Sequence, residues 1–310
     1  MVTQTKEKHV FNNAHIGIIC TLTAILLLSF RGILVKLAYQ HNISVMDLFY
    51  YRFLFSLPLL WGFALYTKRK QLKQLKLNNF NIIISCICAG FFGYYLATLM
   101  DFYSLKFIDV NISRVITYTF PAYVLIWNAI IEKRLPQSKY IVAFLIIQIG
   151  LYFTLGGLDI SLLIANKTGA IFALISAISY SFYIIINQQI GKKIGSILFT
   201  TLAVTFSFLF INLHFFVFYN ADSATISITG FIIILTIAVF CTFIPLLLIS
   251  EGIKRIGAAR LSLLTTIGPI TTALFAFIIL GETLTYQQMV GAILVITVLI
   301  VIERRVKNSK

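Results

Sequence analysis

Apolar runs of about twenty residues alternate with short polar segments along the whole chain. A helix rises 1.5 Å per residue, so about twenty apolar residues are enough to cross the hydrocarbon core of a bilayer. The runs are continuous and do not alternate position by position, which favours membrane helices over barrel strands. The pattern predicts ten spans, at 16–38, 45–66, 80–103, 110–131, 140–157, 168–190, 196–218, 229–252, 257–280 and 286–303.

Two stretches, 100–135 and 248–282, share one design. Each contains the end of one span, a short turn and a second span with a proline near its middle. Three identities hold at a fixed offset of 148 residues: Lys106 with Lys254, Thr117 with Thr265, and Pro121 with Pro269. A proline in mid-span has no N–H to donate, so it interrupts the helix. We therefore expect an internal duplication, with helix breaks at Pro121 and Pro269.

Basic residues gather in every second connection and in the C-terminal tail. They lie at 68–76, 133–139, 192–193, 254–260 and 304–310. Because cytoplasmic loops are enriched in lysine and arginine, this register predicts that both termini are cytoplasmic. With ten spans, the two copies are then inserted in opposite directions, as in many secondary transporters. The predicted fold class is an all-α polytopic membrane protein with ten transmembrane helices in two inverted five-helix repeats, residues 1–157 and 158–310.

Composition agrees with this fold and excludes several functions. The chain is 59% hydrophobic and 11% charged, with a mean hydropathy of +0.94, which excludes a pair of soluble domains. The net charge of +15 follows the loops and forms no aromatic-interleaved basic face, so no nucleic acid partner is expected. The cysteines all fall inside apolar runs, where packing is the expected role: Cys20, Cys86, Cys88 and Cys241. No hydrolase, zinc, Walker or dinucleotide motif is present. We expect no enzyme activity, no metal and no cofactor.

Motifs in both halves carry a family resemblance. In the second half, GIKRIGAARLSLLTTIGP follows Glu251 and LGETLT closes the next span. The first half has Lys36 near the end of its first span, DLFYYRF around Arg52, and TYTFP ending at Pro121. With these residues the chain resembles the EamA branch of the drug/metabolite transporter (DMT) superfamily over nearly its whole length. The resemblance implies ten helices in two inverted five-helix repeats, a central cavity and transport of small metabolites.

Two positions depart from the family pattern. Phe30-Arg31-Gly32 stands where an aromatic–glycine pair is frequent in the first span, and the acidic residue that closes the first repeat is shifted to Glu132. The first departure bears on substrate contacts, and the second on an interface turn.

Ionisable groups inside spans are costly and indicate function by default. A hairpin centred near residue 41 places Arg31 level with Arg52, roughly 10–12 Å from the outer end of the spans. Two guanidinium groups at one depth can hold a carboxylate or a phosphate. The alternative is that they bond to carbonyls of broken helices and brace the fold. The same hairpin pairs Lys36 with Asp47 at the rim, and Ser44 with Asp47 forms a predicted capping box.

A second set of candidates joins the third and fourth spans. Asp101 and Arg114 lie near the same depth across a short turn, so we expect an ion pair that either gates the outer mouth or braces the fold. Repeat positions of Arg114 and Tyr118 are hydroxyl residues in the second half. The substrate-binding candidates are Arg31, Arg52, Tyr94, Asp101, Arg114, Tyr118, Tyr180, Asn187, Ser262 and Thr266. Outside this set, Glu251 is expected to pair locally with Lys254 and Arg255, and His214 to be a packing residue.

The sequence thus predicts an inner-membrane secondary transporter, acting as an exporter of a small metabolite such as an amino acid or another anionic or zwitterionic solute, by alternating access. The alternatives are an exchanger of phosphorylated or nucleotide-linked metabolites, and a non-transporting membrane assembly or receptor subunit. The expected partners are a small-molecule substrate and membrane lipid, with the protein as a monomer or homodimer.

Overall fold

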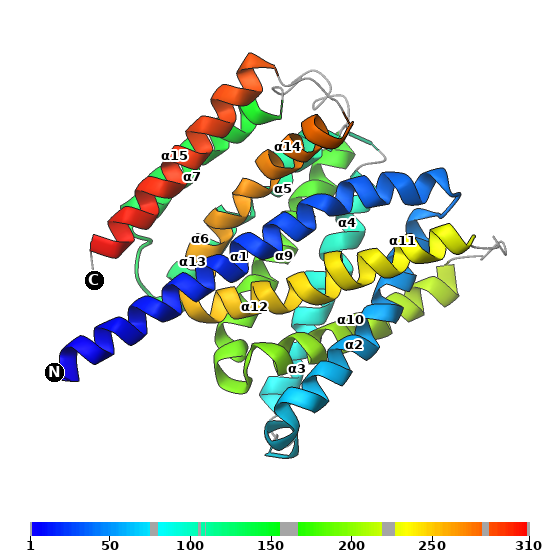
Figure 1. Ribbon diagram of the computed structural model, residues 1–310, viewed down its shortest axis with the longest axis horizontal. Coiled ribbons are helices and arrows are strands. Elements are labelled where there is room, and N and C mark those ends of the chain that lie inside the picture. Colours follow the sequence, from blue (N-terminus) through cyan, green and yellow to red (C-terminus); the bar gives the residue numbers. More distant parts are fainter. Residues whose placement is uncertain are drawn as a thin grey trace. The chain divides into compact units, whose positions relative to one another are not determined.

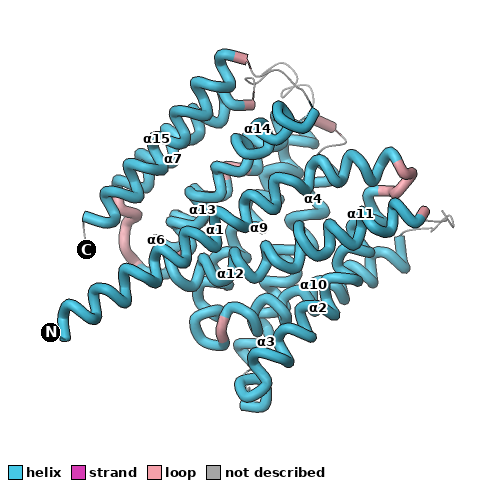
Figure 2. The backbone as a smooth tube through the Cα atoms, viewed as in Figure 1, coloured by secondary structure: helices cyan, strands magenta, loops and turns pink. Residues whose placement is uncertain are grey.

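The computed structural model describes residues 2–74, 80–104, 107–108, 110–155, 167–218, 227–280 and 285–308. Every regular element in these ranges is a helix (Figures 1 and 2), which confirms an all-α polytopic membrane protein. In chain order the elements are α1 (Val2–Gln40), α2 (Val45–Gln74), α3 (Phe80–Ala89), η1 (Gly90–Leu96), α4 (Ala97–Ser104), α5 (Val110–Thr117), α6 (Phe120–Glu132), α7 (Ser138–Thr154), α9 (Lys167–Ile194), α10 (Ser196–Phe218), α11 (Ile228–Ala238), η2 (Val239–Phe243), α12 (Ile244–Ile256), α13 (Ala258–Leu264), η3 (Thr265–Ile267), α14 (Gly268–Leu280) and α15 (Tyr286–Asn308).

The helices coincide with the apolar runs. Nine helical segments of the described ranges are long and apolar enough to cross a membrane, and the shorter apolar helix α7, with 17 residues, occupies the predicted fifth span. Helix α1 begins at Val2, well before the predicted start at residue 16, because its polar N-terminal part continues the helix beyond the apolar stretch Asn13–Arg31.

Four spans are interrupted. Residues 80–104 contain the π-helical segment η1, and residues 228–256 contain the π-helical segment η2. Shifting η1 by the repeat offset of 148 gives residues 238–244, which enclose η2, Val239–Phe243. The fourth and ninth spans break in turn, between α5 and α6 and at the 3₁₀ turn η3. Irregular backbone at matching places in the two halves supports the predicted duplication.

The chain packs as two compact units. Unit 1 comprises Met1–Tyr95 and Ile186–Gly257, and unit 2 comprises Leu96–Ile185 and Ala258–Lys310. Each unit therefore draws on both predicted repeats, and the chain passes between units at the end of η1, inside α9 and after Gly257. Units defined by packing and repeats defined by sequence divide the chain differently, so the repeat boundary near residue 157 stays a prediction.

In unit 1, α1 packs along α12, and α2 packs on α10 and α11 (Figure 1). One apolar core joins the α1–α2 corner to α11 and η2; its buried members are Ala38, Ile43, Leu48, Ile234, Ile237 and Cys241. The third span meets α10 at Gly90, the first residue of η1, where an added Cβ would lie 2.4 Å from the carbonyl oxygen of Ala203. Only glycine fits so close a backbone approach.

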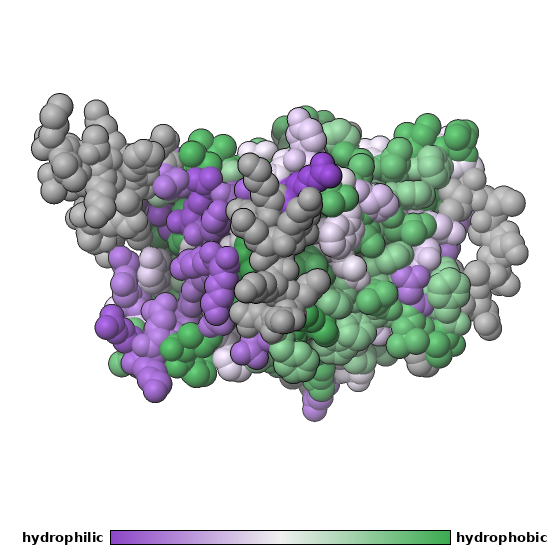
Figure 3. All heavy atoms as spheres, turned by 90° about the horizontal axis from the view of Figure 1, so that it is seen from below, coloured by the Kyte–Doolittle hydropathy of each residue, from purple (hydrophilic) through white to green (hydrophobic). Residues whose placement is uncertain are grey.

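In unit 2, α7 and α15 run side by side (Figure 1). The start of α9 packs on the α4–α5 connection, where a Cβ at Gly169 would lie 2.8 Å from Ile108. Large apolar side chains stay exposed on the outer sides of many helices, and hydrophobic residues cover much of the face seen in Figure 3. Exposed apolar area on this scale is what lipid contact requires.

Candidate functional site

Arg52 is a buried cation of unit 1. It lies on α2 with 6% of its surface exposed. The carbon of its guanidinium group is 4.7 Å from the ring centroid of Phe53 and 5.2 Å from that of Phe49. An arginine within about 6 Å of an aromatic centroid gains roughly 0.5–2 kcal/mol from the ring, depending on its desolvation. The rings therefore offset part of the cost of placing this charge inside a span.

Cys241 relates the two predicted arginines to each other. Its thiol, in η2, donates a hydrogen bond of 3.3 Å to the carbonyl oxygen of Leu27, one turn before Arg31 on α1. The same thiol lies within electrostatic range of both Arg31 and Arg52. Arg31 on α1 and Arg52 on α2 therefore belong to the same unit and are both within electrostatic range of one thiol.

Tyr94 joins this group from the other π-helical segment. It is buried in η1, and its ring centroid is 6.3 Å from that of Phe53. We call Arg31, Arg52, Phe53, Tyr94 and Cys241 the arginine cluster. Both π-helical segments contribute a member, and π-helical turns are frequent at functional sites.

The rim of the first hairpin is built by Ser44. The amide of Asp47 donates to the Ser44 hydroxyl at 3.1 Å, and that hydroxyl donates to the Asp47 carboxylate at 2.6 Å. The predicted capping pair is therefore formed. The side chain of Lys36, the other predicted rim residue, lies outside the described residues.

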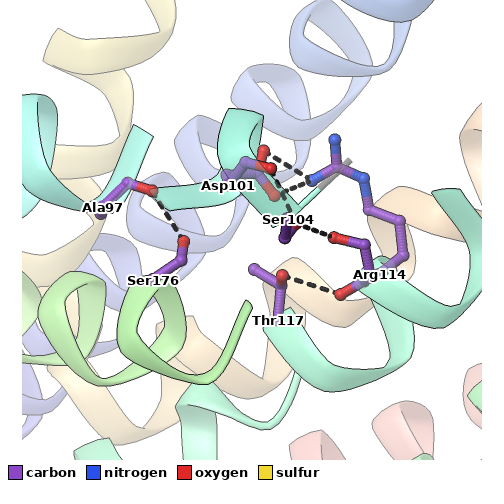
Figure 4. A network of polar contacts seen from close by, with 7 residues as sticks. Ala97, Asp101, Ser104, Arg114, Thr117 and Ser176 are labelled. Atoms are coloured by element: carbon purple, nitrogen blue, oxygen red, sulfur yellow. Dashed lines mark hydrogen bonds and ion pairs between the residues drawn. The ribbon is translucent and has the colours of Figure 1, made fainter. Parts of the chain in front are cut away.

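Asp101 and Arg114 form the predicted ion pair in unit 2 (Figure 4). Nη1 of Arg114 donates to both carboxylate oxygens of Asp101, at 3.2 and 3.3 Å. The side chain of Asp101 is 12% exposed and that of Arg114 is 29% exposed. Both partners belong to the same unit, so the pair fixes α4 against α5.

A chain of hydroxyl groups continues from this pair (Figure 4). Ser104 donates to the carbonyl oxygen of Asp101 at 2.7 Å, and its hydroxyl lies 2.7 Å from that of Ser113. Thr117 donates to the Ser113 carbonyl, and Ser176 of α9 donates to the carbonyl of Ala97. These bonds satisfy polar groups that would be costly inside an apolar unit.

The helix breaks lie directly before the two prolines. Helix α5 ends at Thr117 and α6 begins at Phe120, so the break precedes Pro121; η3 ends at Ile267, before Pro269. Threonine hydroxyls bond the carbonyls of the preceding turn: Thr119 to Ile116, Thr265 to Ser262, and Thr266 to Leu263. Hydroxyl groups of this kind let a membrane helix tolerate a break.

The other candidates lie in packing positions. Asn187 is buried in unit 1 and accepts a hydrogen bond of 3.0 Å from Ser250. Ser262 and Thr266 are fully buried, and their hydroxyls bond carbonyls of their own helix. The ring of Tyr180 packs edge-on against Phe120, which also lies 6.3 Å from Tyr118. This geometry favours helix packing for Asn187, Ser262 and Thr266. The two tyrosines form an aromatic group with Phe120.

Two sets of polar contacts between helices were not predicted from the sequence. Glu251 pairs with Arg255 as predicted, at 2.7 Å, but it also accepts from Ser196 at the start of α10, while Arg255 donates to Asn13 of α1. Arg260 of α13 donates from Nε and Nη2 to both carboxylate oxygens of Glu303 on α15. No sequence signal points to these partners, because they depend on which helices pack together.

His214 accepts or donates one hydrogen bond of 3.0 Å, between Nδ1 and the hydroxyl of Tyr95. Within the described ranges, no group of three histidine, cysteine, aspartate or glutamate residues is arranged to hold a metal ion.

The comparisons with known proteins agree with this architecture. A solved crystal structure superposes with a TM-score of 0.75, covering 94% of this chain and 98% of that chain at 16% sequence identity, which shows the same fold. An uncharacterized transporter from Bacillus subtilis (strain 168), YcbK, is 28% identical over 292 residues, 93% of each chain. An uncharacterized transporter from Archaeoglobus fulgidus is 26% identical over 191 residues, 61% of this chain and 65% of that protein.

The family model accounts for both halves of the chain separately. The EamA-like transporter family matches residues 15–156 and again residues 167–304. Its two matches cover the spans on either side of the predicted repeat boundary. The chain therefore belongs to the EamA-like transporter family.

Proposed function

We propose that this transporter is a secondary exporter of a small anionic or zwitterionic metabolite in a bacterial inner membrane. It works by alternating access, with both termini in the cytoplasm. The observation that carries the proposal is the arginine cluster, in which Arg31 and the buried Arg52 are both within electrostatic range of the buried thiol of Cys241. Charged residues within spans face a substrate or ion pathway far more often than they serve packing alone.

The physical argument is one of charge balance. Two guanidinium groups within electrostatic range of one thiol carry like charges, and low polarity inside the membrane strengthens the repulsion between like charges. An anion that contacts both groups removes the repulsion and makes charge-assisted hydrogen bonds. The aromatic rings of Phe49 and Phe53 lie within cation–π distance of the Arg52 group. The cluster therefore favours a solute with a carboxylate or phosphate group.

The position of the cluster suits alternating access. Its members come from α1, α2 and the two π-helical segments, and the chain leaves unit 1 at the end of η1. A π-helical turn has an extra residue per turn and strained hydrogen bonding, so it bends more readily than an α-helix. Solute binding beside η1 can in this way be coupled to a change in the path of the third span.

The test uses purified protein and a panel of dicarboxylates, amino acids and sugar phosphates. A compound that binds the folded state raises the unfolding temperature. Each stabilising compound is then loaded into proteoliposomes and its flux is followed. We expect Arg52→Ala to reduce flux and binding at least about tenfold, because a hydrogen bond to a charged group contributes about 1.5–3 kcal/mol. Arg69→Ala, at an exposed position of the same helix, is the matched control.

The outcomes separate the alternatives. Flux that requires the same solute on the opposite side would identify an exchanger. Two guanidinium groups suit a phosphorylated solute as well as they suit a carboxylate. Binding without flux would identify a receptor or assembly subunit. Equal flux in Arg52→Ala and in the wild type would overturn the assigned site.

A further inference from the structure

Two arginine–carboxylate pairs in unit 2 use different edges of the guanidinium group. Arg260 presents Nε and Nη2 to Glu303, so its two parallel N–H groups are filled by two oxygens. Arg114 instead presents the single nitrogen Nη1 to both oxygens of Asp101. The Arg260 pair thus uses two nitrogens of the guanidinium group, whereas the Arg114 pair uses only one.

Among the described residues, only Asp101 accepts hydrogen bonds from the guanidinium group of Arg114. No described residue accepts a hydrogen bond from its Nε or Nη2, and Figure 4 shows a terminal nitrogen that points away from Asp101. Nε–H and Nη2–H are parallel and spaced to match the two oxygens of a carboxylate. This is the same edge that Glu303 occupies on Arg260.

The two arginine side chains differ in exposure. The Arg114 side chain is 29% exposed, compared with 11% for Arg260. Arg114 lies one turn before the helix break at Tyr118, and the hydroxyl chain from Ser104 to Ser113 holds the α4–α5 pair beside it. The Asp101 pair thus fixes the guanidinium group through Nη1, and the Arg114 side chain is the more exposed of the two arginines.

The charge on Asp101 limits what binds there. Asp101 and Arg114 together carry no net charge, so an incoming monoanion gains two directed hydrogen bonds but little long-range attraction. A phosphate dianion would be repelled more strongly by Asp101, and it would find the Nη1 donor already occupied. The pair therefore suits a carboxylate that binds weakly and is released readily.

We propose that the Nε–Nη2 edge of Arg114 is a second binding position of this protein, specific for a carboxylate group. Asp101 is the positioning residue: it orients the guanidinium group, and its negative charge lowers the affinity of that group for the bound carboxylate. The inference rests on the proposed function, since a carboxylate position on Arg114 would be a second contact for the class of solute proposed there. The carboxylate belongs either to a soluble anion or to the headgroup of phosphatidylserine.

The experiment measures thermal unfolding of the full chain in phosphatidylcholine nanodiscs against sodium acetate, with sodium chloride and inorganic phosphate at the same ionic strength. Acetate is expected to raise the unfolding temperature saturably and more than the other salts. Arg114→Lys keeps the charge but loses the fork, so half-saturation should need about tenfold more acetate. Asp101→Asn removes the competing charge, so half-saturation should need less acetate than in the wild type. Arg260→Lys is the control and should titrate as the wild type does.

The two variants should shift the half-saturating acetate concentration in opposite directions. Each variant is compared with itself across the titration, so the test stays decisive even if a variant is less stable. An acetate response unchanged by Arg114→Lys, or weakened by Asp101→Asn, overturns the proposal, as does the absence of any acetate response. Loss of the response in Arg52→Ala, with Arg114→Lys unaffected, would assign acetate to the arginine cluster and leave the proposed function standing. Nanodiscs containing phosphatidylserine distinguish the sources: a lipid carboxylate at Arg114 would abolish the acetate response there, and a soluble one would not.

Discussion

Gly291 and Gly150 bring α15 and α7 into backbone contact. A Cβ at Gly291 would lie 2.5 Å from the carbonyl oxygen of Gly150 and 2.5 Å from the amide nitrogen of Thr154. Both atoms belong to the backbone of α7 and cannot rotate away. We expect Gly291→Ala to lower the free energy of unfolding by about 1–3 kcal/mol, as overpacking does elsewhere. Thermal unfolding in detergent measures this loss.

Gly62 supplies the control for that prediction. A Cβ at this position in α2 would meet no atom within 4 Å. Alanine is favoured over glycine inside a helix by about 0.5–1 kcal/mol, so Gly62→Ala should leave stability unchanged or raise it. Equal losses in the two variants would show that the close approach of α7 and α15 is not what requires glycine at position 291.

Ser104 and Ser113 should respond unequally to alanine. A hydroxyl has one proton, and that of Ser104 goes to the carbonyl oxygen of Asp101, so Ser113 must donate to Ser104. Ser104→Ala therefore removes two hydrogen bonds and leaves a buried donor on Ser113, whereas Ser113→Ala removes one. We expect a larger loss for Ser104→Ala, with each bond contributing about 0.6 kcal/mol in a membrane protein. Chemical unfolding of both single variants and the double variant measures the coupling; a larger loss for Ser113→Ala would reverse the assigned donor.

Arg255 and Lys254 both contact Glu251, and only one contact should matter for stability. Arg255 Nε lies 2.7 Å from the carboxylate, and its Nη1 bonds Asn13 of α1. Lys254 Nζ lies 3.9 Å away, with 41% of its side chain exposed. We expect Arg255→Ala to cost about 1.5–3 kcal/mol and Lys254→Ala less than about 0.5 kcal/mol. Thermal unfolding at low and high salt compares them, and similar losses would mean that the link from α12 to α1 is not stabilising.

Local sequence patterns were enough for the parts of the fold that depend on neighbours along the chain. Continuous apolar runs predicted the spans, because crossing a bilayer requires length and hydrophobicity and little else. The Asp101–Arg114 pair was predictable for a similar reason: a short turn between two helices fixes which residues share a depth. The breaks before Pro121 and Pro269 follow from the missing N–H of proline.

Long-range partners were not predictable. Glu303 lies on α15 and Arg260 on α13, so their pairing depends on the packing of helices that the sequence does not align. Cys241 was expected to be an apolar packing residue, and nothing local shows that its thiol lies within electrostatic range of Arg31 and Arg52. The π-helical segments also lack a local pattern, because a single extra residue in a turn changes no apolar periodicity over so short a stretch.

Gly90 connects this irregular backbone to the arginine cluster. It begins η1, and a Cβ there would lie 2.4 Å from the carbonyl oxygen of Ala203 and 2.8 Å from the amide nitrogen of Ser207 on α10. Gly90→Ala must push α3 away from α10, at a cost of about 1–3 kcal/mol. Tyr94 lies one turn further along η1 beside Phe53, so the same displacement should move the cluster as well.

The expected result is therefore a double effect of Gly90→Ala: a lower unfolding temperature and, in the folded protein, weaker stabilisation by the anions that respond to Arg52→Ala. Gly291→Ala is the comparison, since it should lower stability by a similar amount through unit 2 while leaving anion binding at the cluster unchanged. Titrating both variants with the same stabilising anion separates the effects. If the two variants lost anion binding equally, the loss would follow overall stability, and η1 would have no special part in positioning Tyr94. If only Gly90→Ala lost anion binding, the π-helical segment η1 would be part of the binding site, because it determines the orientation of side chains on the third span.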